Sequence, residues 1–213
     1  MAAFWKRWRR QVPSAPADLR AIIDHFNEAA ADEKNFPSTI DPRIYHVQLI
    51  LDHFGDINGR RVLDVGSGKG RFARVLKERY PGASLCAFDL AEAMLRFVPQ
   101  AIDTCGGSMT ALPFRSAAFD CAYATESLEH AVDIEGAVAE MCRVVKPGGR
   151  IAIIDKNAEQ WGRLKTPAWE KWFRREHLER LLKRHCANVS SRPISYWDDV
   201  APDGLFLAWL AEK

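Results

Sequence analysis

The sequence lacks the features that would assign it to several large classes of protein. Its 213 residues carry a formal net charge of only +2, so no overall basicity argues for nucleic-acid binding. No apolar run approaches the roughly 20 residues that cross a bilayer. The five cysteines have no CxxC spacing, which indicates reduced, mostly buried thiols in a reducing compartment. We therefore expect one cytoplasmic globular domain without a nucleic-acid partner.

The one local asymmetry of charge is at the N-terminus. Residues 1–20 contain basic side chains interleaved with Phe4, Trp5 and Trp8, and only one acidic residue. Such a segment can lie on an anionic membrane surface, which would make residues 4–10 a peripheral membrane contact. The alternative is a solvated tail, because Pro13 and Pro16 interrupt any helix. Both interpretations stay open.

From residue 60 onward, short apolar runs alternate with longer helical patterns. The pattern predicts strands at 61–65, 84–89, 119–124, 150–155 and 204–210, and helices at 71–80, 91–98, 134–145 and 169–184. The third helix is expected to stop at "KPGG" (146–149), where proline cannot continue it and glycine tolerates a positive φ. Nearly continuous apolar strands predict a parallel sheet covered on both faces, with ligands bound beyond the carboxyl ends of its strands.

The first of these strands runs into the glycine-rich stretch "DVGSGKG". Its acid, Asp64, precedes three glycines that permit a tight turn and a close approach of a ligand to the backbone, at Gly66, Gly68 and Gly70. A second acid, Asp89, ends the next strand, where a carboxylate can bind a pair of ribose hydroxyls. A dinucleotide motif would have glycine where Arg71 stands. The negative charge of Asp64 also suits a cationic amino-acid ligand better than a pyrophosphate.

Four motifs carry a resemblance to a known family. "VLDVGSGKGRFA" and "FDLAEAML" resemble the first two motifs of class I S-adenosylmethionine-dependent methyltransferases. "LPFRSAAFD" and "EMCRVVKPGGRIAI" are similar to the type 11 methyltransferase domain, and together the match covers roughly residues 45–155. The resemblance implies an α/β, Rossmann-like class I methyltransferase fold: a mostly parallel seven-stranded sheet with helices on both faces. It also implies S-adenosyl-L-methionine as the cofactor.

The same resemblance implies a role for individual residues. The turn from Gly66 through Ser67 and Gly68 to Gly70 would cradle the methionine part and ribose, with Asp64 toward the amino group and Asp89 on the ribose hydroxyls. Leu90 and Met94 would flank the adenine. Ser108, followed by Met109, stands where the family commonly has an acid that accepts a hydrogen bond from the adenine amino group, and a hydroxyl makes this bond weaker. Thr125 completes the predicted cofactor-binding set.

The resemblance also suggests a division of the chain. A tail at 1–20 would precede a single methyltransferase domain at 21–213. Within that domain we expect an N-terminal helical lid at 21–58, a cofactor-binding core at 60–155, a substrate cap and helix at 156–185, and C-terminal strands at 186–213. Arg43, Tyr45 and His46, in the second half of the lid, are candidates to contact the cofactor carboxylate or the acceptor.

"ESLEH" (126–130) follows the fourth strand, which in this fold ends beside the transferable methyl group. If the stretch is one helical turn, Glu126, Glu129 and His130 share a face and suit Mg²⁺, Mn²⁺ or Zn²⁺. The ExxEH pattern resembles the metal-binding motif of quinone-biosynthesis O-methyltransferases and small-RNA 2′-O-methyltransferases, which recruit a later histidine; here that would be His177. Two alternatives stay open: His130 as a catalytic base or substrate contact, with Glu126 as a second catalytic candidate, and a structural role. The sequence predicts no particular metal.

The substrate is suggested only by an aromatic stretch after the fifth strand. Trp169, Trp172 and Phe173 fall at helical spacing, with Trp161 nearby, and they either pack the helix on the sheet or form an aromatic cap over the acceptor. We therefore expect O-methylation of a small, apolar or aromatic acceptor. The alternatives are RNA 2′-O-methylation and a non-catalytic protein that binds the cofactor as a partner of another protein. The sequence does not predict an oligomeric state.

Overall fold

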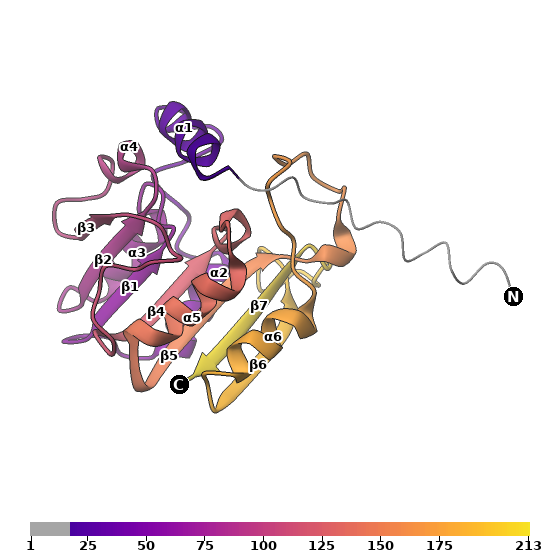
Figure 1. The fold of residues 1–213 in the computed structure, drawn as a ribbon. Coiled ribbons are helices and arrows are strands. Elements are labelled where there is room, and N and C mark those ends of the chain that lie inside the picture. Colours follow the sequence, from indigo (N-terminus) through magenta and orange to yellow (C-terminus); the bar gives the residue numbers. More distant parts are fainter. Residues whose placement is uncertain (1–17) are drawn as a thin grey trace, which may run out of the picture.

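The computed structural model describes residues 18–213, which fold around one twisted sheet (Figure 1). Its seven strands lie in the order β3-β2-β1-β4-β5-β7-β6, and β7 runs antiparallel to the other six. The strands are β1 (Arg61–Val65), β2 (Ser84–Asp89), β3 (Asp103–Gly106), β4 (Phe119–Thr125), β5 (Val145–Lys156), β6 (Asn188–Ile194) and β7 (Phe206–Glu212). The strand order reverses between β1 and β4, so the loops after these two strands border the crevice where such sheets bind ligands.

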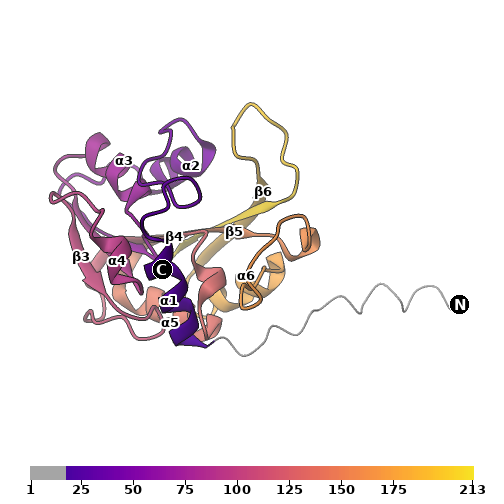
Figure 2. The ribbon, with the colours of Figure 1, turned by 90° about the horizontal axis from the view of Figure 1, so that it is seen from above.

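Helices cover both faces of the sheet (Figure 2). The helices are α1 (Leu19–Ala29), α2 (Tyr45–Phe54), α3 (Arg71–Arg79), α4 (Glu92–Leu95), α5 (Ile134–Val144) and α6 (Arg175–Lys183), with 3₁₀ turns at Leu128–His130 and Ala158–Gln160. Helices α2 and α3 lie on one face, and α5 and α6 on the other. Helix α1 packs on the short α4 at one end of the sheet. This arrangement confirms the predicted fold class.

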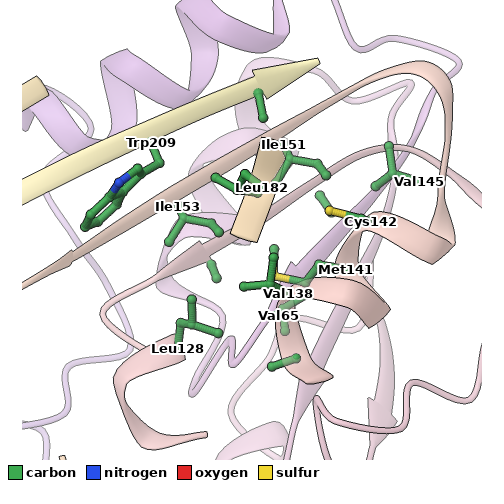
Figure 3. Close-up of a cluster of buried hydrophobic side chains, with 14 of the residues drawn as sticks. Val65, Leu128, Val138, Met141, Cys142, Val145, Ile151, Ile153, Leu182 and Trp209 are labelled. Atoms are coloured by element: carbon green, nitrogen blue, oxygen red, sulfur yellow. The ribbon is translucent and has the colours of Figure 1, made fainter. Parts of the chain in front are cut away.

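Two apolar clusters, one on each face, hold the helices to the sheet. On the α5 and α6 face, Val138 and Met141 pack with Leu182 against the strand residues Ile151 and Ile153 (Figure 3). All five side chains are buried, and each contributes about 1.5–3 kcal/mol of hydrophobic stabilisation. Because both faces are covered, the central strands are apolar along most of their length. The sheet is therefore a rigid support for the loops at its carboxyl end.

The predicted strands are observed, and those expected within 186–213 are β6 and β7; β3 was not predicted. Three helix predictions need correction. The helix predicted at 91–98 is the single turn 92–95. The helix predicted at 134–145 ends at Val144, before the proline, because Val145 is extended and already belongs to β5; the positive φ of Gly148 lies inside that strand.

The helix predicted at 169–184 begins only at Arg175. Upstream, Phe173 forms a β-bridge with Asn157, and its N–H donates to the Lys156 carbonyl at 2.9 Å, which holds this stretch extended. The proposed aromatic stripe on one helix face is therefore wrong. Phe173 packs on Trp209 in the core, while the Trp172 ring packs edge-on against Trp161.

The two halves of the predicted lid lie in different places. Helix α1 lies above the carboxyl end of the sheet, whereas α2 packs on the sheet beside α3. Arg43 pairs with Asp41 at 2.7 Å, and His46 is buried between Tyr196 and Phe206, so neither borders the cavity described below. Within residues 18–213, no helix has the length and apolar character needed to span a membrane. The proposed membrane contact at 4–10 lies outside the described residues and stays a prediction.

Candidate active site

A cavity of about 600 Å³ opens at the carboxyl end of the sheet, under helix α1. It is bordered by the loops after β1, β2, β3, β4 and β5, as expected for this sheet topology. The predicted residues that line it are Asp64, Gly66, Ser67, Gly68, Asp89, Leu90, Met94, Ser108, Met109, Thr125, Glu126 and His130. Gly70 does not line it; in a left-handed conformation, it caps the N-terminus of α3.

The glycine turn after β1 is shaped by two different requirements. Gly66 has φ +75°, and a Cβ there would lie 2.4 Å from the Cβ of Ser127, so no larger residue fits. Ser127 is itself fixed, because its hydroxyl donates to the Val65 carbonyl at 2.7 Å. Gly68 has φ +53°, but a Cβ there would meet no atom within 4 Å. The backbone at Gly68 therefore faces open space that a bound group can approach.

Asp64, at the end of β1, is a buried carboxylate without a full set of partners. Its side chain lies on the cavity, its residue is 4% exposed, and its Oδ2 atom has no hydrogen-bond partner. Burial raises the pKa of Asp64 to about 7, and the neighbouring charge of Asp89 adds to the shift. An unpaired buried acceptor is costly, and a cationic amino group in the cavity would satisfy it.

Asp89, at the end of β2, is held in a fixed orientation by the backbone. Its Oδ2 atom accepts a hydrogen bond from the Gly68 N–H at 2.7 Å, and its Oδ1 atom accepts one from the Ala91 N–H at 2.8 Å. Each oxygen keeps a further lone pair for a ligand hydroxyl. Leu90 and Met94 follow it on the same wall of the cavity. The acceptor oxygens of Asp64 and Asp89 fit the amino group and the ribose hydroxyls of S-adenosylmethionine.

The stretch 126–130, on another wall of the cavity, differs from the sequence prediction. Residues 126–130 are not one helical turn, because Glu126 has a left-handed φ of +50° and the 3₁₀ turn begins only at Leu128. Glu126 is therefore directed to Arg71, whose guanidinium lies 3.3 Å from its Oε1 atom. The predicted face shared by Glu126, Glu129 and His130 does not exist. His177 is exposed on α6 and does not line the cavity.

His130 lies on the cavity wall as a neutral imidazole. Burial lowers its pKa to about 3, and the positive charge of Lys156 contributes to the shift. Its Nδ1 atom has no hydrogen-bond partner, and its Nε2 atom lies 3.5 Å from Oε1 of Glu129. Phe26 of α1 packs edge-on to the ring, with 4.9 Å between the ring centroids. The site thus places an uncharged nitrogen base against an aromatic lid residue.

Glu129, Lys156 and Glu170 form a buried charged cluster beneath His130. Lys156 donates a hydrogen bond to Oε1 of Glu129, and its Nζ atom lies 3.3 Å from Oε1 of Glu170. Lys156 and Glu170 were not predicted as site residues. A charged residue at the end of an apolar strand could have indicated Lys156. No pattern in the sequence indicated Glu170.

The remaining wall comes from the segment around α1, from the glycine turn and from the loop after β5. Lys69, between two glycines of the turn, is 1% exposed at its side chain and forms a 2.7 Å ion pair with Glu33. Its ammonium also lies 4.6 Å from the centroid of the Phe97 ring. Apolar side chains from α1 and from two loops complete this side of the cavity: Ile22, Phe26, Phe36, Leu164 and Pro167. The sequence prediction missed these residues, because their positions depend on tertiary contacts.

Comparisons with known proteins agree with the fold. Residues 63–153 match the family model described as a methyltransferase domain. A demethylmenaquinone methyltransferase from Renibacterium salmoninarum is 31% identical over 152 residues, which cover 70% of this chain and 61% of that protein. A malonyl-[acyl-carrier protein] O-methyltransferase from Methylococcus capsulatus is 36% identical over 98 residues, which cover 43% of this chain and 36% of that protein. The chain thus spans less than two thirds of the length of these relatives.

A solved structure of another methyltransferase has the same fold. Phosphoethanolamine N-methyltransferase 2 from Haemonchus contortus, in complex with S-adenosyl-L-methionine, matches with a TM-score of 0.73 at 17% identity, over 92% of this chain and 60% of that one. The sheet order and the glycine turn define the class I methyltransferase fold. With the sequence matches, the chain contains a class I S-adenosylmethionine-dependent methyltransferase domain, and S-adenosyl-L-methionine is the cofactor of that class.

Proposed function

We propose that this protein transfers a methyl group from S-adenosyl-L-methionine to a hydroxyl oxygen of a small, apolar or aromatic acceptor. The observation that carries the proposal is the neutral His130 on the cavity wall, with an unpartnered Nδ1 atom. A hydroxyl nucleophile must lose its proton during the transfer, so a nearby uncharged base is the group that this chemistry requires.

The acceptor class follows from the proton that must be lost and from the cavity walls. A phenol or an enol releases its hydroxyl proton more readily than an aliphatic alcohol, so it places the smaller demand on a neutral base. The apolar side of the cavity, with Ile22, Phe26 and Leu164, suits the ring of such an acceptor. A planar acceptor could pack against Phe26 while its hydroxyl lies near the imidazole.

The protein contributes to this reaction mainly by positioning the cofactor and the acceptor. The bound cofactor supplies a methyl group on a sulfonium, and the acceptor oxygen must lie in line at about 3–3.5 Å from the methyl carbon. In such a transfer the C–O bond would form as the C–S bond breaks, the electron pair of the C–S bond would stay on sulfur, and the hydroxyl proton would pass to His130. Asp64 and Asp89 hold the cofactor, and the buried walls exclude water.

The test is methyl transfer from methyl-labelled S-adenosylmethionine to a panel of phenols, with the matched anilines as alternative acceptors and O-methylated phenols, which lack a free hydroxyl, as negative controls. We expect labelled ethers from the phenols and a loss of about 100-fold in rate for His130→Phe. His177→Phe, which changes an exposed histidine, should keep the wild-type rate. Labelled product only from the anilines, or an unchanged rate for His130→Phe, would refute the proposed chemistry.

A further inference from the structure

We propose that the ammonium of Lys156 permanently occupies the cation position of the ESLEH site, so that Lys156 takes the place of a divalent metal. Ligand atoms of Glu129, His130 and Glu170 lie within 4.8 Å of one another, which is a spacing suited to a metal ion. The inference concerns the same site as the proposed function and rests on it only for the consequence drawn for methyl transfer.

The geometry places the lysine between the two carboxylates. Lys156 donates a hydrogen bond to Oε1 of Glu129, and its Nζ atom lies 3.3 Å from Oε1 of Glu170. The side chain of Lys156 is only 10% exposed, and that of Glu129 is 1% exposed. The ammonium therefore lies at the position where an ion bridging the same two carboxylates would have to bind.

The backbone fixes each partner of this contact. Lys156 is the last residue of β5, and Asp155 before it accepts hydrogen bonds from the Lys156 N–H at 2.8 Å and the Glu129 N–H at 3.1 Å. Asp155 thus ties the end of β5 to the 3₁₀ turn. Glu170 is held from the other side by the Trp172 indole N–H at 2.7 Å. The lysine and its acids cannot separate without disturbing these elements.

The carboxylate charges of this site favour the covalently held ammonium of Lys156 over a free metal ion. Buried carboxylates without a counter-charge are strongly destabilising, and Lys156 supplies that charge in every molecule. A divalent metal would have to expel a protonated ammonium that is covalently held at the site. The residues present therefore do not fit a metal, and no step of the reaction is routed through one.

Lys156 is thereby a positioning residue. It holds Glu129 beside His130, whose Nε2 atom lies 3.5 Å from the same carboxylate oxygen. Methyl transfer should then be insensitive to EDTA. Removal of the lysine should leave Glu129, Glu170 and His130 as a vacant ligand set, because Oε2 of Glu129 already lacks a partner. Lys156→Ala should thus create the metal site that the wild type lacks.

The test is calorimetric titration of Mn²⁺ into the full chain, for the wild type and for Lys156→Ala. We expect no saturable binding to the wild type, and binding at least tenfold tighter to Lys156→Ala. The additional change Glu129→Gln should abolish the acquired binding, and Lys183→Ala, on the exposed face of α6, should behave as the wild type. Circular dichroism confirms folding of each variant, and Lys156→Met, which keeps the apolar stem, replaces Lys156→Ala if that variant unfolds.

Two outcomes would overturn the inference. One is saturable Mn²⁺ binding to the wild type that is lost in Glu129→Gln. The other is a folded Lys156→Ala or Lys156→Met protein that binds no Mn²⁺. Neither readout requires methyl transfer, so failure of the proposed reaction would be distinguished from failure of this inference.

Discussion

Lys69 and Glu33 form a 2.7 Å ion pair that joins the glycine turn to the segment following helix α1. Lys69 also donates to the Asp32 carbonyl at 3.4 Å, so two consecutive residues of this segment contact one ammonium. The turn that borders the cavity is thereby connected to the helix that covers it. Occupation of the turn and closure of α1 should therefore be coupled.

The first prediction tests this coupling. Glu33→Gln leaves the buried ammonium of Lys69 without its counter-charge, and α1 should open more often. We expect faster amide hydrogen exchange in residues 19–37 and faster dissociation of S-adenosylhomocysteine. Glu28→Gln, which removes an exposed acid of α1 itself, is the matched control. Equal exchange in the two variants would show that the ion pair does not hold the lid.

A second prediction contrasts two glycines of the turn. Gly66→Ala places a Cβ 2.4 Å from Ser127 and should cost about 3 kcal/mol of unfolding free energy, since overpacking adds to the left-handed strain. Gly68→Ala meets no atom within 4 Å and should cost only about 1 kcal/mol, while its methyl group still weakens cofactor binding. Denaturant unfolding of the two cofactor-free variants measures the difference. Equal destabilisation would contradict the packing described at Gly66.

A third prediction concerns the pH dependence of stability. The pKa of Asp64 is about 7 in the folded protein, against an ordinary value of 3.8. Between these pH values the folded state retains a proton that the unfolded state has released, so this group's contribution to stability is lost as the pH rises toward 7. Asp64→Asn should therefore stabilise the cofactor-free protein by about 2 kcal/mol at pH 8, and little at pH 4.

Unfolding in denaturant at pH 4 and pH 8 gives this difference directly. Asp52→Asn, an exposed carboxylate on α2, serves as the control and should show no such dependence. A gain for Asp64→Asn that is the same at both pH values would mean that Asp64 is not the titrating group.

The fold and the cavity-lining residues at the ends of β1 and β2 could be predicted because their signals are local. β-Branched and apolar runs mark the strands, and the three glycines and two acids occupy fixed places at strand ends. Local patterns could not show that Glu126 is left-handed, which separates it from Glu129 and His130. Likewise, Phe173 is held in an extended segment by its bridge to Asn157, a contact from another part of the chain. Glu170 reaches Lys156 only because of that segment.

The most direct test of the account is calorimetric titration of S-adenosylhomocysteine into the wild type and Asp89→Ala. Asp89 orients the glycine turn through Gly68 and offers both its oxygens to a ligand, so its loss removes charge-assisted hydrogen bonds worth about 1.5–3 kcal/mol. We predict saturable one-to-one binding to the wild type, weakened about 10- to 100-fold in Asp89→Ala. An absence of binding to the folded wild type, or equal affinity in the two proteins, would contradict the assignment of this cavity to the cofactor.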